Sequence, residues 1–511
     1  MRELNELFVG DGGLSREEAL KVLGRVIEMG VDFKSRKQFY HPDRSLTPQA
    51  IMVEPLPETG IPIEDVLEKL SLEYLPGMPN FGSSQFMGFP DAGNSLAGLS
   101  GAVLGEFLNV NLINSTFCSR IATEMEIAVI RWFREIVGYP ASPPPTDGAQ
   151  VGGMVLYGGT MSNYTAALIA RERAFPGTLK TGIRFDPSKV RVVVPERIGH
   201  YTVAASLSWC GLGSENLLRA PIREFRYDQP ALRQLLVDAR RRGERVIMLV
   251  AYAGDSRTMT VDDLVGLHDL VRNESPETWL HCDGCHGTSL SFSPEHRKQL
   301  SGIGLWDSIT LDPHKVLAVP YPLSLFLLRN PEDSRIITTE SDLIMRQQNS
   351  LGQTTPVIGS KAFLSLRLWV LMKTHGVQGI AELIERRCAL ARKLAEKVEN
   401  DERFLLLNHV AINSVVFIFV PPQFRGSMTR ENADATSAIN RMIYEHLMAE
   451  GRYYLHSFVA TDNMNRLGHG ADFGVNVLRF MGGNALITDS MLDELLNYLA
   501  EVAEKYNSST G

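Results

Sequence analysis

The chain has 511 residues, of which 44% are hydrophobic, and its formal net charge is −8. This length and composition are typical of a globular enzyme of two or three domains, and they exclude a disordered or fibrous protein and argue against nucleic acid as a partner. No uninterrupted apolar run reaches membrane-spanning length and no signal peptide is evident, so we expect no membrane partner and a cytoplasmic location. The five irregularly spaced cysteines would stay reduced in that compartment.

The N-terminal part of the chain is predicted to be a helical arm. Residues 15–29 place apolar side chains at helical spacing, and Ser15 followed by Glu18 is typical of a capping box. A second helix is expected at 63–70, after a proline-rich segment. We therefore treat residues 1–90 as an arm that packs against the rest of the molecule.

A glycine turn follows the first buried strand of the main body. The apolar run 154–157 predicts this strand, and Gly159 and Thr160 then lead into an amphipathic helix. Free backbone N–H groups at the start of a helix bind phosphate well. Gly159, Thr160 and Ser162 are therefore candidates for a phosphate site, and a helix start without a ligand is the alternative.

Strands and helices alternate from about residue 190 to 330. This order predicts a mostly parallel sheet covered on both faces, with ligands at the carboxyl ends of its strands. His200 opens one of the helices, after a short buried strand. An imidazole there can cover a flat ligand and move protons, whereas a cap or a surface position is the simpler interpretation.

Two of the apolar runs are followed by residues of opposite charge, Asp283 and Lys315. Neighbouring strand ends would bring both side chains into one pocket. A partly desolvated lysine amine can condense with an aldehyde. A carboxylate ~4 Å from a pyridine nitrogen would favour its protonated form by roughly 4 kcal/mol at an effective dielectric of ~20. This pairing is what pyridoxal 5'-phosphate requires of a protein.

A competing motif lies in the same stretch. Cys282, Cys285 and His286 fit the C-x-x-C-H pattern of covalent haem attachment, and with His281 they could ligate a metal. Structural zinc sites usually have a second ligand pair at a fixed spacing, and the remaining cysteines are isolated. We therefore expect no metal. The isolated cysteines are Cys118, Cys210 and Cys388.

His281-x-Asp283 followed by Asp312-Pro-His-Lys315 resembles the group II pyridoxal phosphate-dependent amino acid decarboxylases, and the resemblance covers roughly residues 81–480. It implies an α/β fold of the aspartate aminotransferase type (fold type I). In that fold a large domain with a mostly parallel, seven-stranded sheet, expected here at 91–375, precedes a small α+β domain, expected at 376–511. It also implies a homodimer whose active sites lie at the interface, with the arm at 1–90 as the dimerisation segment.

The resemblance assigns roles to individual residues. Lys315 would carry the cofactor, Asp283 would face its pyridine nitrogen and His200 would stack on its ring, and these three are the predicted catalytic residues. The remaining cofactor contacts that it implies are Gly159, Thr160, Ser162, Ser256 and His314.

The implied reaction is decarboxylation of an L-amino acid to the amine and carbon dioxide. A tyrosine on a lid, expected here between residues 330 and 359, commonly donates the final proton in the family, but no tyrosine occurs from 322 to 375. Oxidation to an aldehyde, ammonia and peroxide, another lyase or transaminase reaction, and a silent partner-binding homologue are therefore kept as alternatives. Arg120, Asp255 and His286 are candidates for substrate selection.

Overall fold

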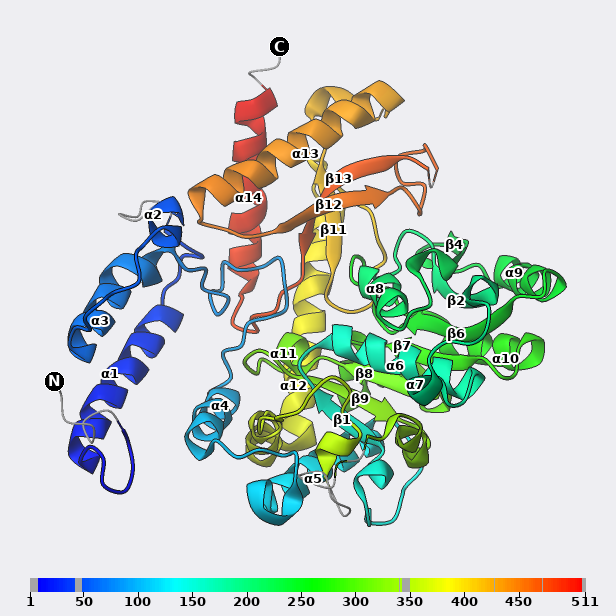
Figure 1. The fold of residues 1–511 in the computed structure, drawn as a ribbon. Helices are drawn as coiled ribbons and strands as arrows, with labels where there is room; N and C mark the ends of the chain where they lie inside the picture. Colours follow the sequence, from blue (N-terminus) through cyan, green and yellow to red (C-terminus); the bar gives the residue numbers. More distant parts are fainter. Residues whose placement is uncertain are drawn as a thin grey trace.

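The computed structural model describes residues 8–41, 48–339, 341, 350–426, 428–470 and 472–507. Figure 1 shows a helical arm beside two larger parts, of which one surrounds a wide sheet and the other a smaller sheet near the C-terminus. Within the described residues, no helix combines the length and apolarity that crossing a bilayer demands.

The wide sheet has seven strands in the order β1-β9-β8-β7-β6-β2-β3. Only β9 runs antiparallel to its neighbours, so the predicted mostly parallel sheet is confirmed. Its strands are β1 (Gly153–Leu156), β2 (Val190–Pro195), β3 (Leu217–Ala220), β6 (Arg245–Tyr252), β7 (Trp279–Asp283), β8 (Ser308–Leu311) and β9 (Ser324–Leu328).

Both faces of this sheet are buried, because its strands are almost continuously apolar. Val193 and Leu249 face one core, and Val192 and Met248 face the other. The first core is covered by α5 (Ile121–Ile136), α9 (Gln229–Arg241) and α10 (Leu264–Glu274), and the second by α6 (Gly159–Ala174) and α8 (Tyr201–Trp209). Short elements complete this part: α7 (Thr178–Thr181), α11 (Pro313–Val316) and the hairpin of β4 (Ile222–Arg223) and β5 (Arg226–Tyr227).

The smaller sheet is antiparallel, in the order β10-β11-β13-β12. Its strands are β10 (Phe404–Leu406), β11 (Val415–Phe419), β12 (His456–Thr461) and β13 (Gly474–Phe480). The end of α12 (Leu366–Glu399) packs on it with α13 (Arg430–Glu450) and α14 (Asp489–Asn507). Helix α12 breaks at Gly376, where φ is 62°, beside the boundary expected between the two domains.

The arm contains α1 (Arg16–Lys34), α2 (Pro48–Met52) and α3 (Ile63–Lys69), and α4 (Leu96–Leu108) follows it. The predicted capping box is confirmed: the Glu18 backbone N–H donates to the Ser15 hydroxyl, and the Ser15 backbone N–H donates to the Glu18 carboxylate. Apolar side chains of α1 and α4 line an open groove of about 1120 Å³.

A buried ion pair joins α5 to the segment that enters α12. The Lys361 ammonium lies 3.1 Å from Glu126 Oε1, and both side chains are almost fully buried. Lys361 Nζ also donates to the Val155 carbonyl in β1 at 2.5 Å. This contact fixes the position of the first strand of the wide sheet.

The predicted lid, 330–359, lies partly outside the described residues. The described part forms two 3-10 turns, Pro331–Ile337 and Leu351–Gln353.

Candidate active site

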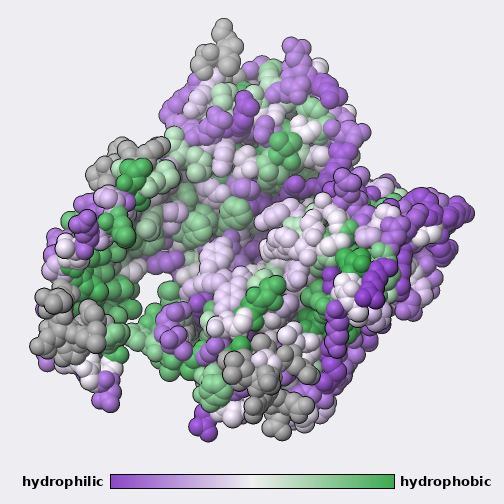
Figure 2. Space-filling model, viewed as in Figure 1, coloured by the Kyte–Doolittle hydropathy of each residue, from purple (hydrophilic) through white to green (hydrophobic). Residues whose placement is uncertain are grey.

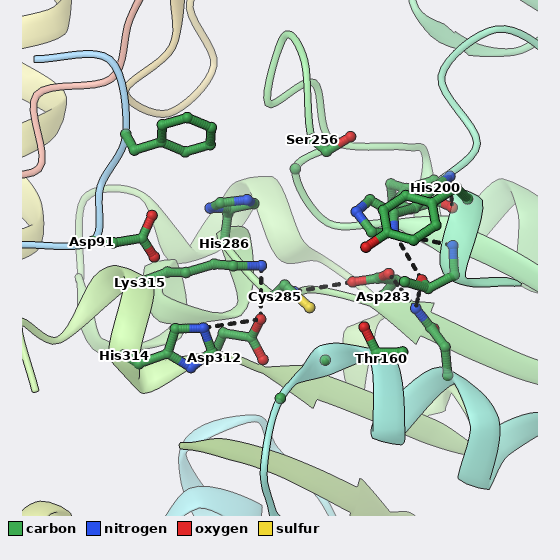
Figure 3. A pocket seen from close by; sticks show the side chains of 18 of the residues that line it. Asp91, Thr160, His200, Ser256, Asp283, Cys285, His286, Asp312, His314 and Lys315 are labelled. Carbon is green, nitrogen blue, oxygen red and sulfur yellow. Dashed lines mark hydrogen bonds and ion pairs between the residues drawn. The ribbon is translucent and has the colours of Figure 1, made fainter. Parts of the chain in front are cut away.

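A cavity of about 380 Å³ lies at the carboxyl ends of the strands of the wide sheet, where ligands bind in such folds. Asp283 at the end of β7, Lys315 in α11 and Thr160 at the start of α6 all line it, together with His200 (Figure 3). The small domain contributes Arg479 from β13. Residues predicted from separate motifs are thus brought together.

Asp283 is held as an anion. It is 5% exposed. Its Oδ2 accepts a hydrogen bond from Asn163 Nδ2 at 3.0 Å, and its Oδ1 accepts one from the Cys285 backbone N–H at 3.3 Å. Burial alone would raise the pKa of Asp283, but His200 and the hydrogen bonds from Cys285 and Asn163 bring that pKa below its ordinary value. A buried, ionised carboxylate of this kind can stabilise a protonated ring nitrogen.

Asn163 orients this carboxylate. Its amide nitrogen also donates to Thr202 Oγ1 at 2.9 Å, and its amide oxygen lies 3.1 Å from His281 Nε2. Burial lowers the pKa of His281 to about 4, so the ring is neutral and donates one hydrogen bond to Asn163. The sequence analysis did not select Asn163, although it lies in the first turn of the helix that follows the glycine turn.

Lys315 is paired with a second carboxylate. Its Nζ lies 2.8 Å from Asp312 Oδ2, and Asp312 also accepts a hydrogen bond from the Ser324 hydroxyl. Burial favours a neutral amine, but Asp312 outweighs it and raises the pKa of Lys315 above its ordinary value. We expected an accessible neutral amine, whereas Asp312, which the sequence analysis did not select, favours the protonated form of Lys315.

The glycine turn forms the other end of the cavity. Gly158 has φ +146°, and a Cβ on Gly159 would lie 2.6 Å from Cys285 Sγ, so the close approach of this turn requires glycine. Gly159 and Thr160 line the cavity at the N-terminus of α6, where N–H groups are free. Ser162 does not line it. Its hydroxyl is buried and has no hydrogen-bond partner within the described residues.

His200 caps α8 and faces the cavity. Its Nδ1 lies 2.7 Å from Thr202 Oγ1, and its backbone N–H donates to the Tyr252 hydroxyl at 2.7 Å. Burial lowers the pKa of His200, and the nearby Asp283 opposes this shift only in part. His200 and Asp283 thus each favour the charged form of the other.

The other predicted residues divide into two groups. Ser256 and His314 line the cavity, and His314 is fixed by its hydrogen bond to the Leu323 carbonyl at 2.6 Å. Asp255 does not line it: its carboxylate accepts hydrogen bonds from the backbone N–H groups of its own turn. Arg120 is exposed at the start of α5 and also lies outside the cavity lining. Of the substrate-selecting candidates, only His286 lines the cavity.

Several lining residues were not predicted to belong to the site. Asp91 and Phe89 belong to the loop before α4, Tyr321 follows α11, and Arg479 comes from β13. Arg479 donates to the carbonyls of Ser256, at 2.5 Å, and Gly88, at 3.2 Å.

These residues fit pyridoxal 5'-phosphate. They supply a lysine amine, an ionised carboxylate for the ring nitrogen and a helix start for the phosphate, and the unpartnered Ser162 hydroxyl lies beside that start. Among the described residues, no group of three or more His, Cys, Asp or Glu side chains is placed to hold a metal ion. An α/β fold with this arrangement around one cavity defines an enzyme that binds its cofactor through a lysine.

The pyridoxal-dependent decarboxylase conserved domain matches residues 48–420, and the chain belongs to this family. It is 25% identical to the aromatic-L-amino-acid decarboxylase of Catharanthus roseus, over 94% of this chain and 96% of that protein. It is 26% identical to human cysteine sulfinic acid decarboxylase, over 84% of this chain and 83% of that protein.

Solved structures have the same fold. Apo mouse CSAD has a TM-score of 0.83 at 22% identity and covers 95% of this chain and 98% of its own. Tryptophan decarboxylase of Catharanthus roseus, in complex with L-tryptophan, has a TM-score of 0.80 at 22% identity and covers 96% of this chain and 99% of its own. The predicted fold, the pyridoxal 5'-phosphate cofactor and the assignment as an amino acid decarboxylase are confirmed.

Proposed function

We propose that this cavity converts an L-amino acid to its amine and carbon dioxide, with Lys315, Asp283 and His200 as the catalytic residues. The observation that supports this proposal is that Lys315 and Asp283 line one cavity from successive strand ends, each with its own polar partners. When bound, the cofactor supplies the electron sink for the bond to carbon dioxide.

Each residue has a defined task in this proposal. Asp283 keeps a proton on the ring nitrogen, because its carboxylate is buried, ionised and fixed by Asn163. His200 covers one face of the ring and excludes water from it. Lys315 would hold the cofactor through its amine, which lies beside the Asp312 carboxylate.

The phosphate would be bound at the start of α6, by the N–H groups of Gly159 and Thr160 with the hydroxyl of Ser162 beside them. Ser256 and His314, which also line the cavity, would make further contacts with the cofactor.

We also propose a homodimer in the cytosol. Val26, Val31, Leu104 and Phe107, on α1 and α4, are exposed although they are large and apolar. Figure 2 shows such surface on the arm and on the part of the main body nearest to it. A second copy related by twofold symmetry would bury this surface. The five cysteines form no disulfide, which suits a reducing compartment.

The second candidate reaction, oxidation to an aldehyde, was kept because no tyrosine occurs from 322 to 375. Tyr321 stands just before that range, lines the cavity and is half exposed. A phenol is therefore present at the site after all, which favours the amine.

The test is product analysis of the purified, cofactor-loaded enzyme in air, with a panel of amino acids. We expect carbon dioxide and amine in equal amounts, and loss of both in Lys315→Ala. Aldehyde with peroxide would overturn the proposal in favour of the oxidative reaction, and release of neither product from any amino acid would overturn both.

A further inference from the structure

We propose that Asp91 binds a positive charge at the end of the substrate side chain, so that the enzyme selects an amino acid that carries a side-chain ammonium or guanidinium group. This inference rests on the proposed decarboxylase function and specifies its substrate class.

Asp91 is a buried carboxylate on the wall of the cavity. It lies in the loop that leads into α4, lines the cavity and is 6% exposed. Its Oδ1 has no hydrogen-bond partner within the described residues. A buried carboxylate oxygen without a partner is costly, so its presence on a cavity wall indicates a ligand that completes it.

The other charged groups of the cavity each have at least one partner. Asp283 accepts hydrogen bonds from Asn163 and Cys285, and Asp312 pairs with Lys315. Arg479 donates to two backbone carbonyls.

Burial lowers the pKa of both His200 and His286, which disfavours a positive charge on either ring. Burial raises the pKa of Asp91, and Lys315, the Tyr321 hydroxyl and His314 oppose this rise. Lys315, the cation with the largest effect on Asp91, is committed to Asp312 and to the cofactor.

The position of Asp91 matches that of a substrate side chain. Figure 3 shows Asp91 on one side of Lys315, and Asp283 and Thr160 on the other. The cofactor would occupy the side of Asp283 and Thr160, and the reacting carbon of the substrate would lie near Lys315. The side chain can then extend toward Asp91. Phe89, Tyr321 and Met481 line the same cavity and offer apolar surface to the methylene groups.

A carboxylate at this position would discriminate strongly between substrates by the charge of their side chains. A cationic side chain would pair with it, whereas a neutral side chain of the same length would leave Asp91 buried and unpaired. An acidic side chain would add repulsion. Loss of one member of a buried, hydrogen-bonded charge pair typically corresponds to a change of roughly 30-fold to 1,000-fold.

The experiment compares substrates that differ only in charge. L-Ornithine and L-norleucine have side chains of equal length that end in ammonium and methyl, and L-2,4-diaminobutyrate and L-norvaline form a second pair. We would measure kcat/KM for carbon dioxide release with the cofactor-loaded parent, with Asp91→Asn and with Asp434→Asn, whose residue is exposed on α13.

We expect the parent and Asp434→Asn to prefer the cationic member of at least one pair. Asp91→Asn should lower kcat/KM for that member by roughly 30-fold or more and leave the neutral member nearly unchanged. Equal losses for both members would mean that Asp91 serves Lys315 instead, and would overturn the proposal. So would carbon dioxide release from neutral or acidic amino acids alone, although the decarboxylase function would then stand.

A binding measurement tests the role of Asp91 independently of the decarboxylation reaction. Putrescine and pentylamine differ in the same way as ornithine and norleucine, and their binding to the cofactor-loaded protein can be measured by calorimetry. We expect putrescine to bind more tightly to the parent, and the difference to vanish in Asp91→Asn. If no amino acid releases carbon dioxide, the proposed function fails, and the calorimetry still decides the role of Asp91: equal binding of the two amines to the parent would overturn it.

Discussion

Replacing Asp312 by asparagine should make Lys315 more reactive toward the cofactor. The Lys315 ammonium lies 2.8 Å from the Asp312 carboxylate, and its side chain is 25% exposed. At an effective dielectric of ~20 this distance corresponds to an attraction of roughly 6 kcal/mol as an upper limit. Solvent reduces that figure, and we take about half of it, which lowers the pKa of the amine by about two units. Asparagine has almost the same shape and can keep the contact with Ser324.

The assay is covalent attachment of pyridoxal 5'-phosphate to the cofactor-free protein. Samples would be reduced with borohydride at intervals and Lys315 modification followed by mass spectrometry over a range of pH. Since only the neutral amine attacks the aldehyde, the attachment rate at neutral pH should rise by up to ~100-fold in the variant, and its pH dependence should move to lower pH. Asp434→Asn serves as the control for loss of a carboxylate elsewhere.

An unchanged or slower rate at every pH, in a variant whose circular dichroism and unfolding match the parent, would refute this reasoning. It would mean that Asp312 assists the lysine in some other way than by holding its proton.

Three further predictions concern other parts of the structure. Lys361→Met leaves Glu126 buried without its ion pair, so the free energy of unfolding in urea should fall by about 3–5 kcal/mol; a loss below about 1 kcal/mol would show that the pair adds little. Burial lowers the pKa of His281 from 6.5 to about 4, so the unfolded chain binds more protons in this range. The contribution of His281 to the free energy of unfolding is therefore fully present above pH 6.5. It should be lost as the pH falls toward 4, which lowers the free energy of unfolding by about 3 kcal/mol in all. His281→Gln should remove that part of the pH dependence, and an equal slope in both proteins would contradict the assignment. Tyr321→Phe should raise the share of aldehyde and peroxide among the products measured in air, and an unchanged product ratio would exclude its phenol as a proton source.

The sequence predicted the wide sheet and its two charged residues because both have strong local signals. The strands are almost continuously apolar, and Asp283 and Lys315 follow two of them directly, so parallel topology alone brings them together. Lys315 was assigned correctly to the cavity wall, but the pKa of its amine depends on Asp312, whose distance from Nζ no pattern reveals.

The small domain was harder to predict. The buried stripe of α13 includes the polar residues Thr436 and Asn440, which interrupt the apolar periodicity on which helix prediction depends. Strand β12 is mostly half-buried and lacks clear alternation. Asp91 lies in an irregular loop, where neither the helical nor the strand periodicity of apolar residues applies. Asp255 was expected to alter the pocket, yet it binds the N–H groups of its own turn, an arrangement that is visible only in three dimensions.

Arg479 has a consequence for the order in which the protein is made. It joins β13 to the carbonyls of Ser256 and Gly88, three segments that are far apart along the chain. The ribosome synthesises most other residues of the cavity wall, including Lys315, long before this arginine, and Met481 just after it. A nascent chain can therefore form the wide sheet early, but it completes the wall of the cavity only after β13 has emerged.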